Sequence, residues 1–181
     1  MTKTPDNIFL TGFMGTGKSS VGRLLSDSVG YRLIDTDEEI VRRSGKSITA
    51  IFAEQGEPAF RDMETQLLRD MVRDEIAGFV ISCGGGIVLR NENVALMKKL
   101  GLIVLLTASV EEILRRTSHD RSRPLLQTPD PRRRIEELLA DRSPRYLSAA
   151  DITIDTTGLT PQQVVKHLIR RFDTRQSSPN P

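Results

Sequence analysis

One motif near the start of the chain fixes how that part must fold. Residues Gly12-Phe13-Met14-Gly15-Thr16-Gly17-Lys18-Ser19 match the pattern G-x-x-x-x-G-K-[ST] in full. An apolar run over residues 8–10 precedes the motif, and residues 20–29 carry apolar side chains at helical spacing. A strand, a glycine-rich turn and a helix are the context in which this motif forms a phosphate-binding loop. The alternative is a turn that only joins strand to helix, and a full match in this context disfavours it.

The chemistry expected of this loop follows from its backbone. Glycines let successive N–H groups point into one concavity, and the helix that follows adds its positive N-terminal end. Lys18 is expected to reach the outer phosphates of a nucleoside triphosphate, and the Ser19 hydroxyl to ligate Mg²⁺. The motif therefore predicts triphosphate binding, but it does not say what happens to the γ-phosphate.

The rest of the chain alternates between short apolar runs and segments with helical spacing. Strands are expected over residues 8–10, 31–35, 78–83, 101–106 and 152–154. Helices are expected over residues 20–29, 36–43, 47–56, 58–76, 92–100, 109–117, 132–149 and from 161 onward, with Thr36 or Asp37 capping the second. This alternation predicts a parallel sheet covered by helices on both faces. We expect one domain over residues 1–172 and a disordered tail over residues 173–181.

Composition limits the class of partner. The 181 residues include 26 Lys and Arg against 24 Asp and Glu, no Trp, and only 4% aromatic residues. This balance argues against a nucleic-acid surface. Residues 1–7 lack the apolar core of a signal peptide, and the longest apolar run, residues 102–106, is too short to cross a bilayer. The single cysteine, Cys83, excludes an intramolecular disulfide. A soluble cytoplasmic protein without nucleic-acid or membrane partners is expected.

Ligands of open α/β sheets bind beyond the carboxyl ends of the strands, and acids and glycines follow two of the expected strands. Asp35 ends the second strand and Asp37 follows two residues later, and these two are the best candidates to supply an acid near Mg²⁺. Asp37 alternatively serves only as a helix N-cap. Gly84 to Gly86 follow the third strand and indicate close approach of backbone to a ligand, or a flexible turn.

Arginines surround a polar, proline-containing segment that is expected to form a mobile lid over residues 117–130. They are Arg115, Arg116, Arg121 and Arg123. Arginines on such a segment can close over phosphates and stabilise transferring charge, although each one singly is more often a solvated side chain. The same alternative applies to Arg61 and Arg142 on helices, and Arg61 can form an i,i+3 pair with Glu64.

Together these stretches resemble the shikimate kinase family. The resemblance lies in the phosphate loop and in five further motifs, over residues 7–172. They are Leu33-Ile34-Asp35-Thr36-Asp37, Phe60-Arg61-Asp62-Met63-Glu64, Cys83-Gly84-Gly85-Gly86, Arg123-Pro124-Leu125-Leu126 and Arg142-Ser143-Pro144-Arg145-Tyr146. The phosphate loop alone is shared by many enzymes, whereas the set of six is specific.

The resemblance implies transfer of a phosphoryl group from ATP to the 3-hydroxyl of shikimate, in the pathway to chorismate and aromatic amino acids. It also implies the three-layer α/β/α fold of the nucleoside monophosphate kinases, with a five-stranded parallel sheet, a mobile lid and a monomeric state. In Thr156 to Thr160, the loop before the last helix, this chain lacks the basic residue that some relatives carry there. The adenine contacts of that loop are therefore left unassigned.

The resemblance also implies roles for individual residues. Lys18, Asp37 and Arg123 would act in catalysis, with Asp37 orienting or deprotonating the attacking hydroxyl. ATP would be bound by Gly15, Thr16, Gly17, Lys18, Ser19, Ser20, Arg116 and Arg123. Shikimate would be bound by Asp37, Arg61, Gly84, Gly85, Arg142, Phe52 and Phe60, the two arginines clamping its carboxylate. Mg²⁺ would be held by Ser19 and, through water, by Asp35.

Other functions share part of this pattern. A kinase for gluconate or a nucleoside monophosphate has the same loop and fold, but the paired arginines and triple glycine favour a carboxylated, polyhydroxylated ring. A GTP-dependent switch protein is suggested only by Asp155-Thr156-Thr157-Gly158, which matches D-x-x-G without a following Asn-Lys-x-Asp. A catalytically inactive ATP-binding module has no supporting feature.

Overall fold

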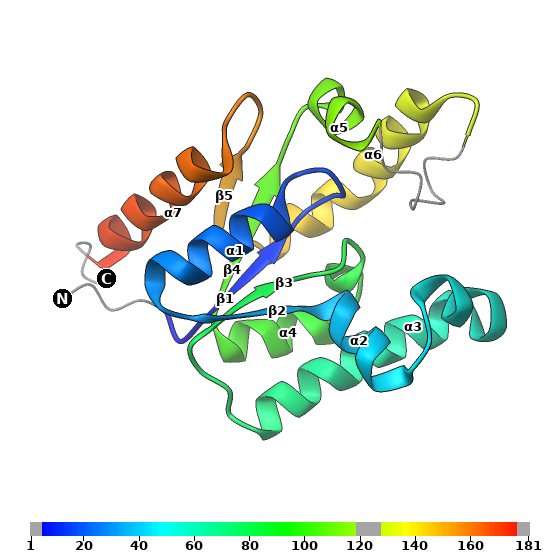
Figure 1. Cartoon of the computed structure of the whole chain (residues 1–181), viewed down its shortest axis with the longest axis horizontal. Helices are drawn as coiled ribbons and strands as arrows, with labels where there is room; N and C mark the ends of the chain where they lie inside the picture. Colours follow the sequence, from blue (N-terminus) through cyan, green and yellow to red (C-terminus); the bar gives the residue numbers. More distant parts are fainter. Residues whose placement is uncertain (1–4, 119–127, 177–181) are drawn as a thin grey trace.

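The computed structural model describes residues 5–118 and 128–176. Their strands form one five-stranded parallel sheet in the order β2-β3-β1-β4-β5, which confirms the predicted fold class (Figure 1). The strands are β1 (Asn7–Thr11), β2 (Arg32–Asp35), β3 (Phe79–Ser82), β4 (Leu102–Thr107) and β5 (Ile152–Asp155). The first strand therefore lies in the centre of the sheet, with β3 on one side and β4 on the other.

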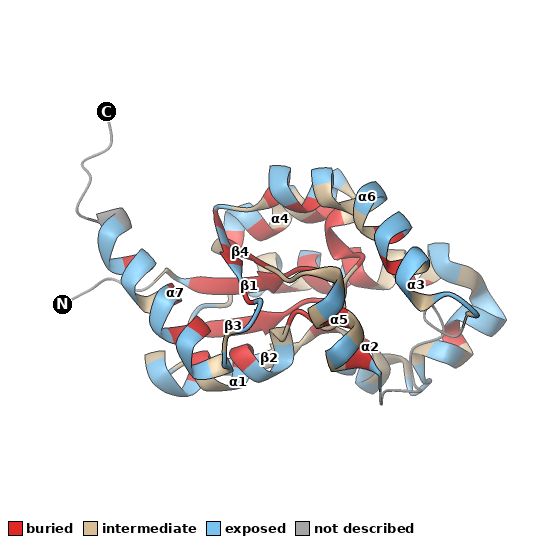
Figure 2. Ribbon diagram, turned by 90° about the horizontal axis from the view of Figure 1, so that it is seen from above, coloured by how far each residue is buried: buried red, intermediate tan, exposed pale blue. Residues whose placement is uncertain are grey.

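Helices cover both faces of this sheet and give three layers. The helices are α1 (Lys18–Val29), α2 (Thr36–Ser44), α3 (Ile48–Arg73), α4 (Asn91–Leu100), α5 (Val110–Thr117), α6 (Pro131–Ala149) and α7 (Pro161–Gln176), with a short 3₁₀ turn at Ile87–Leu89. Figure 2 shows the buried strands between α1 and α7 on one side and α4 and α6 on the other. No helix in the described ranges is long and apolar enough to cross a membrane.

Alternation along the strands divides the core into two clusters. Ile8 and Leu10 of β1 pack with Val21 and Leu25 of α1 and with residues of α7. Phe9, between them, packs into the opposite cluster with α3, α4 and α6. Successive side chains of a strand point to opposite faces, so a strand buried on both faces reads as a continuous apolar run. This explains why the run at residues 8–10 is apolar throughout.

Two element boundaries differ from the prediction, and one predicted division is present. The N-cap of α2 is Asp35, whose Oδ1 accepts hydrogen bonds from the N–H groups of Asp37 at 3.0 Å and Glu38 at 3.4 Å, so neither Thr36 nor Asp37 caps this helix. The two helices predicted over residues 47–76 are both present as the two parts of α3, which has non-helical backbone between them at Gly56. Helix α7 continues to Gln176, so residues 173–176 are helical rather than part of a disordered tail. Residues 177–181 lie outside the described ranges.

Candidate active site

The phosphate loop joins the carboxyl end of β1 to the start of α1. Gly17 is the N-cap of α1 with φ 95°, and no side chain caps this helix end. Gly12 has φ 133°, and a Cβ there would overlap the carbonyl oxygen of Leu106 on β4. Phe13 is anchored in a small apolar cluster with residues of α5 and α6. The loop is therefore held tightly against the sheet while the N–H groups at the start of α1 stay available for an anion.

The side chains of the loop surround a hollow of about 300 Å³, lined by Met14, Gly15, Gly17, Lys18, Ser19, Ser20 and Arg116. The Lys18 ammonium group donates to the carbonyl oxygens of Gly12 at 2.9 Å and Phe13 at 3.0 Å. Ser19 and Ser20 are exposed at the mouth of this hollow. The predicted phosphate-binding residues thus lie together around one concavity.

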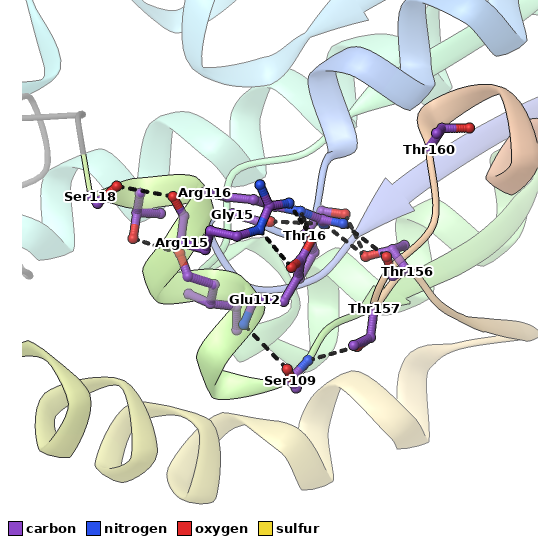
Figure 3. Close-up of polar contacts among 12 residues, drawn as sticks. Gly15, Thr16, Ser109, Glu112, Arg115, Arg116, Ser118, Thr156, Thr157 and Thr160 are labelled. Atoms are coloured by element: carbon purple, nitrogen blue, oxygen red, sulfur yellow. Dashed lines mark hydrogen bonds and ion pairs between the residues drawn. The ribbon is translucent and has the colours of Figure 1, made fainter.

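A second hollow, of about 320 Å³, adjoins the first on the side of α7. Its walls include Thr16, Gly17, Arg116, Thr156, Leu159, Thr160, Pro161 and Val164. Arg116 crosses its edge and donates from Nε to Glu112 at 2.7 Å (Figure 3). A hydrogen bond from Arg115, together with the charge of Arg116, lowers the pKa of Glu112 to about 2. The carboxylate of Glu112 therefore stays charged at physiological pH and fixes Arg116 from the side of α5.

The two predicted acids lie at the start of α2, beside the glycine turn that follows β3. Asp35 pairs with Ser82 in the sheet register and uses Oδ1 to cap α2. The buried Thr36 accepts a hydrogen bond from the N–H of Gly84 at 2.9 Å. A Cβ on Gly84 would overlap Oδ1 of Asp37. The Asp37 carboxylate thus packs directly on the backbone of Gly84, and a side chain at this position would displace it.

Arg61 lies over the same turn from the side of α3. A Cβ on Gly86 would overlap its guanidinium group. Arg61 donates to Glu64 Oε2 at 2.8 Å and to Glu57 Oε1 at 2.7 Å, so the i,i+3 pair considered from the sequence is present. Of these two acids, Glu57 is 54% exposed and Glu64 is fully buried. The ion pair of Arg61 with Glu57 is therefore the one that solvent or a ligand can most easily replace.

Glu64 is a member of this site whose role was not predicted from the sequence. Burial raises the pKa of Glu64 to about 7, with Arg61 opposing the shift and the charge of Asp37 adding to it. Its Oε1 is buried and has no hydrogen-bond partner in the described part of the chain. The positive charge of Arg90 also opposes the rise in the pKa of Glu64. The sequence signal was its position three residues after Arg61, but only the structure reveals its burial.

Helix α6 closes the acceptor side. Tyr146 donates a hydrogen bond from its hydroxyl group to the carbonyl oxygen of Gly85. Burial raises the pKa of Tyr146, and the charges of Arg142 and Arg61 oppose that shift. Arg142 has a buried Nε–H without a hydrogen-bond partner among the residues that the structure describes. The predicted groups Arg61, Gly85 and Arg142 are therefore brought together around Tyr146.

The two predicted aromatic residues form one wall of this region. The rings of Phe52 and Phe60 lie 5.2 Å apart between centroids, at an angle of 32°. Phe60 is buried, whereas Phe52 is 37% exposed. The Arg61 guanidinium carbon lies 5.4 Å from the Phe60 ring centroid. An apolar surface thus adjoins the arginine, which suits a ligand with a ring and an anionic group.

The predicted lid is described only at its two ends. Arg121 and Arg123 lie in residues 119–127, outside the described ranges, so their predicted contacts with phosphates stay predictions. Arg115 is 70% exposed and pairs with Glu112 at 2.7 Å. Of the four arginines considered from the sequence, Arg116 is the one that the described structure places in the wall of both hollows.

The sequence of this chain is similar to that of known proteins. A family model described as shikimate kinase matches residues 14–173. Shikimate kinase from Geobacter metallireducens is 47% identical to this chain over 169 residues, which are 93% of each protein. The chain belongs to the shikimate kinase family. Shikimate kinase from Thermodesulfovibrio yellowstonii is 44% identical, over 92% of this chain and 95% of that protein.

Solved shikimate kinases share the fold as well as the sequence. The Acinetobacter baumannii enzyme, whose structure is a complex with shikimate, has a TM-score of 0.89 and 34% identity, over 98% of this chain and 97% of that one. The Aquifex aeolicus enzyme has a TM-score of 0.79 and 34% identity, over 96% of this chain and 99% of that one. The family expected from the six motifs is therefore confirmed.

Proposed function

We propose that this chain transfers the γ-phosphoryl group of ATP to the 3-hydroxyl of shikimate, giving ADP and shikimate 3-phosphate for chorismate and aromatic amino acid biosynthesis. The observation that carries the proposal is the arrangement of the residues that would bind the phosphate acceptor. There Arg61, Arg142 and the glycine turn converge beside Asp37. In the reaction, the hydroxyl oxygen forms a bond to the γ-phosphorus while the bond to the β–γ bridging oxygen breaks. The hydroxyl proton passes to the carboxylate of Asp37.

The donor side suits a triphosphate. The N–H groups of Gly15, Thr16, Gly17, Lys18, Ser19 and Ser20 would bind the phosphates at the N-terminus of α1. Lys18 now binds two loop carbonyls, and a phosphate would offer its ammonium group a charged acceptor in their place. Arg116 would lie against adenine at the wall of the second hollow. Arg123 would approach the phosphates from the lid.

Mg²⁺ would enter with ATP. The Ser19 hydroxyl and, through water, the Asp35 carboxylate are oxygen donors of the kind that Mg²⁺ prefers. Within the described ranges no group of three or more His, Cys, Asp or Glu residues is placed to hold a metal by itself. The site therefore fits an ion that keeps several waters and is held largely by phosphate oxygens. Bound there, Mg²⁺ would neutralise the charge of the β- and γ-phosphates.

On the acceptor side, Arg142 would offer its buried Nε–H to the shikimate carboxylate, and Arg61 would turn from the exposed Glu57 to the same group. Gly84 and Gly85 would bring backbone N–H groups to the ring, with Phe52 and Phe60 as its apolar wall. We further infer a monomeric, cytoplasmic enzyme that acts without nucleic acid or membrane, in line with its composition.

The alternative of a GTP-dependent switch is disfavoured by the role of its D-x-x-G segment. Asp155 accepts hydrogen bonds from the N–H of Thr157 at 2.9 Å and from its hydroxyl at 2.7 Å. Gly158 has φ 68°, which suits a tight turn. The segment thus forms the turn between β5 and α7, which accounts for the match without guanine nucleotide.

The test is a coupled ADP-release assay with MgATP and a panel of acceptors. Shikimate should support turnover, whereas gluconate and nucleoside monophosphates should give little above background. The Asp37→Asn variant should lose about 10²-fold in kcat while retaining ATP binding, because the attacking hydroxyl loses its proton acceptor. Glu38→Gln, exposed on the same turn of α2, is the matched control. Equal turnover with all acceptors would refute the assignment, and near-normal turnover of Asp37→Asn would refute the role of Asp37.

A further inference from the structure

Thr156 lies directly after β5, beneath the phosphate loop, and is 1% exposed. Its N–H donates to the carbonyl oxygen of Thr107 at 2.8 Å. Its own carbonyl oxygen accepts from Arg116 Nη2 at 2.8 Å, and its hydroxyl oxygen accepts from Arg116 Nη1 at 3.0 Å (Figure 3). Each polar group of this buried residue is therefore hydrogen-bonded, and the bonds connect the end of β5 with β4 and with Arg116 of α5.

The hydroxyl proton of Thr156 makes the connection to the phosphate loop. The hydroxyl oxygen lies 2.9 Å from the carbonyl oxygen of Thr107 and 3.2 Å from that of Thr16, so the hydroxyl group can donate to either of them. The Thr107 carbonyl already accepts the N–H of Thr156. The carbonyl oxygen of Thr107 therefore has a hydrogen bond without the hydroxyl group. In the described part of the chain, the carbonyl oxygen of Thr16 receives its hydrogen bond from the Thr156 hydroxyl.

A carbonyl held from below fixes the direction of the N–H group in the same peptide unit. The peptide bonds of the described chain contain no cis bond, so C=O and N–H of one peptide unit point in opposite directions. The carbonyl of Thr16 points to Thr156, so the N–H of Gly17 points away from it. Gly17 lines both hollows of the donor site. The hydroxyl of Thr156 thus orients an amide group of the phosphate loop.

Arg116 extends the same support to the neighbouring peptide unit. Its Nη1 donates to the carbonyl oxygen of Gly15 at 3.2 Å, and its Nε donates to Glu112 at 2.7 Å. With the two bonds to Thr156, the guanidinium is bound on three of its nitrogens. Such a side chain has already lost its rotamer freedom, so a ligand need not order it.

We infer that Thr156 is a positioning residue for the triphosphate chain of ATP. Its hydroxyl holds the Thr16–Gly17 peptide unit directly, and it holds the Gly15 carbonyl through Arg116, so that the phosphate loop is ordered before ATP binds. The inference rests on the proposed use of ATP.

The test compares Thr156→Val, which keeps the branched shape and loses the hydroxyl, with Thr156→Ser, which keeps the hydroxyl. The probes are inorganic triphosphate and a non-hydrolysable ATP analogue, each with Mg²⁺, titrated by calorimetry. Thr156→Val should weaken the binding of both probes by about tenfold, because the hydroxyl can no longer donate to the Thr16 carbonyl or accept from Arg116. Thr156→Ser should bind within about twofold of wild type. Thr153→Val, on the exposed face of β5, is the matched control.

Inorganic triphosphate has no adenine base, so its binding distinguishes a role of Thr156 at the phosphates from a role at the base. Weakened binding of the ATP analogue alone would place Thr156 on the base side only and would overturn the inference, as would unchanged binding of both probes. In turnover assays the KM for ATP should rise about tenfold in Thr156→Val while the KM for shikimate stays within about twofold. Equal rises would also overturn it.

A second variant covers the case in which Thr156→Val does not fold. Arg116→Lys keeps the charge and loses the fork that binds Gly15 and Thr156. It should weaken inorganic triphosphate binding by a similar factor, and unchanged binding would overturn the inference. Failure of the wild-type chain to phosphorylate shikimate would instead refute the proposed function, because triphosphate binding is measured without an acceptor.

Discussion

Arg142 on α6 carries a buried Nε–H that no described residue satisfies. An unsatisfied buried donor costs about 1–3 kcal/mol, and an anionic ligand would remove this cost. Arg142→Ala should therefore raise the KM for shikimate by about tenfold or more and change the KM for ATP little, as measured by steady-state kinetics. Arg145→Ala, one turn away and bonded to the carbonyl of Leu89 at 3.2 Å, is the control and should leave both values unchanged. Equal rises in both values for Arg142→Ala would place it elsewhere in the site.

Individual site residues were predictable from the sequence to the extent that they lie in contiguous motifs. The motifs indicated Lys18, Asp37 and Arg61, and the structure places all three at the carboxyl edge of the sheet. Glu64 and Thr156 were not assigned roles, because their importance comes from burial and from partners distant in sequence. Thr156 bonds to the carbonyl of Thr16, 140 residues away, and no local pattern records such a contact.

Helix α3 contains a sharp bend whose cause is one residue. Gly56 has φ 81° and ψ 168°, a region that residues other than glycine adopt at a cost of about 1–3 kcal/mol. The nearest atom to a Cβ there would be Pro58 Cδ at 3.5 Å, so the strain of a side chain lies in the backbone alone. Residues before the bend include Phe52 of the acceptor wall.

Gly56→Ala should therefore lower the free energy of unfolding by about 1–3 kcal/mol and raise the KM for shikimate, because relief of the strain shifts the first part of α3. Urea unfolding and steady-state kinetics measure the two effects. Gly30→Ala is the control, since Gly30 ends α1 with φ 72° and has no atom within 4 Å of a Cβ. It should cost stability and leave both KM values unchanged. Wild-type stability in Gly56→Ala would contradict the account.

Elements were predicted well where side chains cap or stop them. Ser47 and Ser109 accept hydrogen bonds from the N–H groups of Ala50 and Glu112, as helix N-caps do. The prediction was less accurate where two residues compete for one role. Asp35 caps α2 although Thr36 and Asp37 have the same chemistry, because β2 ends at Asp35 and leaves its backbone extended with φ −102°. The end of β2, which is set by its pairing with β3, therefore determines which residue is the N-cap of α2.

The folding of the whole chain should depend on pH through Glu64. Its pKa is raised to about 7, whereas in the unfolded chain it is near the usual 4.5. Between these values the folded state retains a proton that the unfolded state has lost, so stability falls as pH rises through this window. The loss attributable to this group is about 3 kcal/mol at most and is complete above pH 7. Arg61 opposes the shift, while Asp37 adds to it.

Urea unfolding of wild type and Glu64→Gln from pH 4.5 to 8 tests this dependence. The stability of wild type relative to Glu64→Gln should decrease as pH rises to about 7 and then stay constant. Glu57→Gln, which removes the exposed partner of Arg61, should keep the wild-type slope. Parallel curves for wild type and Glu64→Gln would show that Glu64 titrates near its ordinary value in the folded protein.

The order β2-β3-β1-β4-β5 has a consequence for how such an enzyme can change its substrate. From β1 the chain runs out to β2 and β3 on one flank, and only later to β4 and β5 on the other. Most of the acceptor side therefore comes from one continuous stretch, residues 35–86, while α6 contributes Arg142 and Tyr146 from outside it. Replacement of residues 36–86 alone would therefore change most of the acceptor side, whereas the phosphate loop, Asp35 and Arg116 lie outside that segment and would be kept.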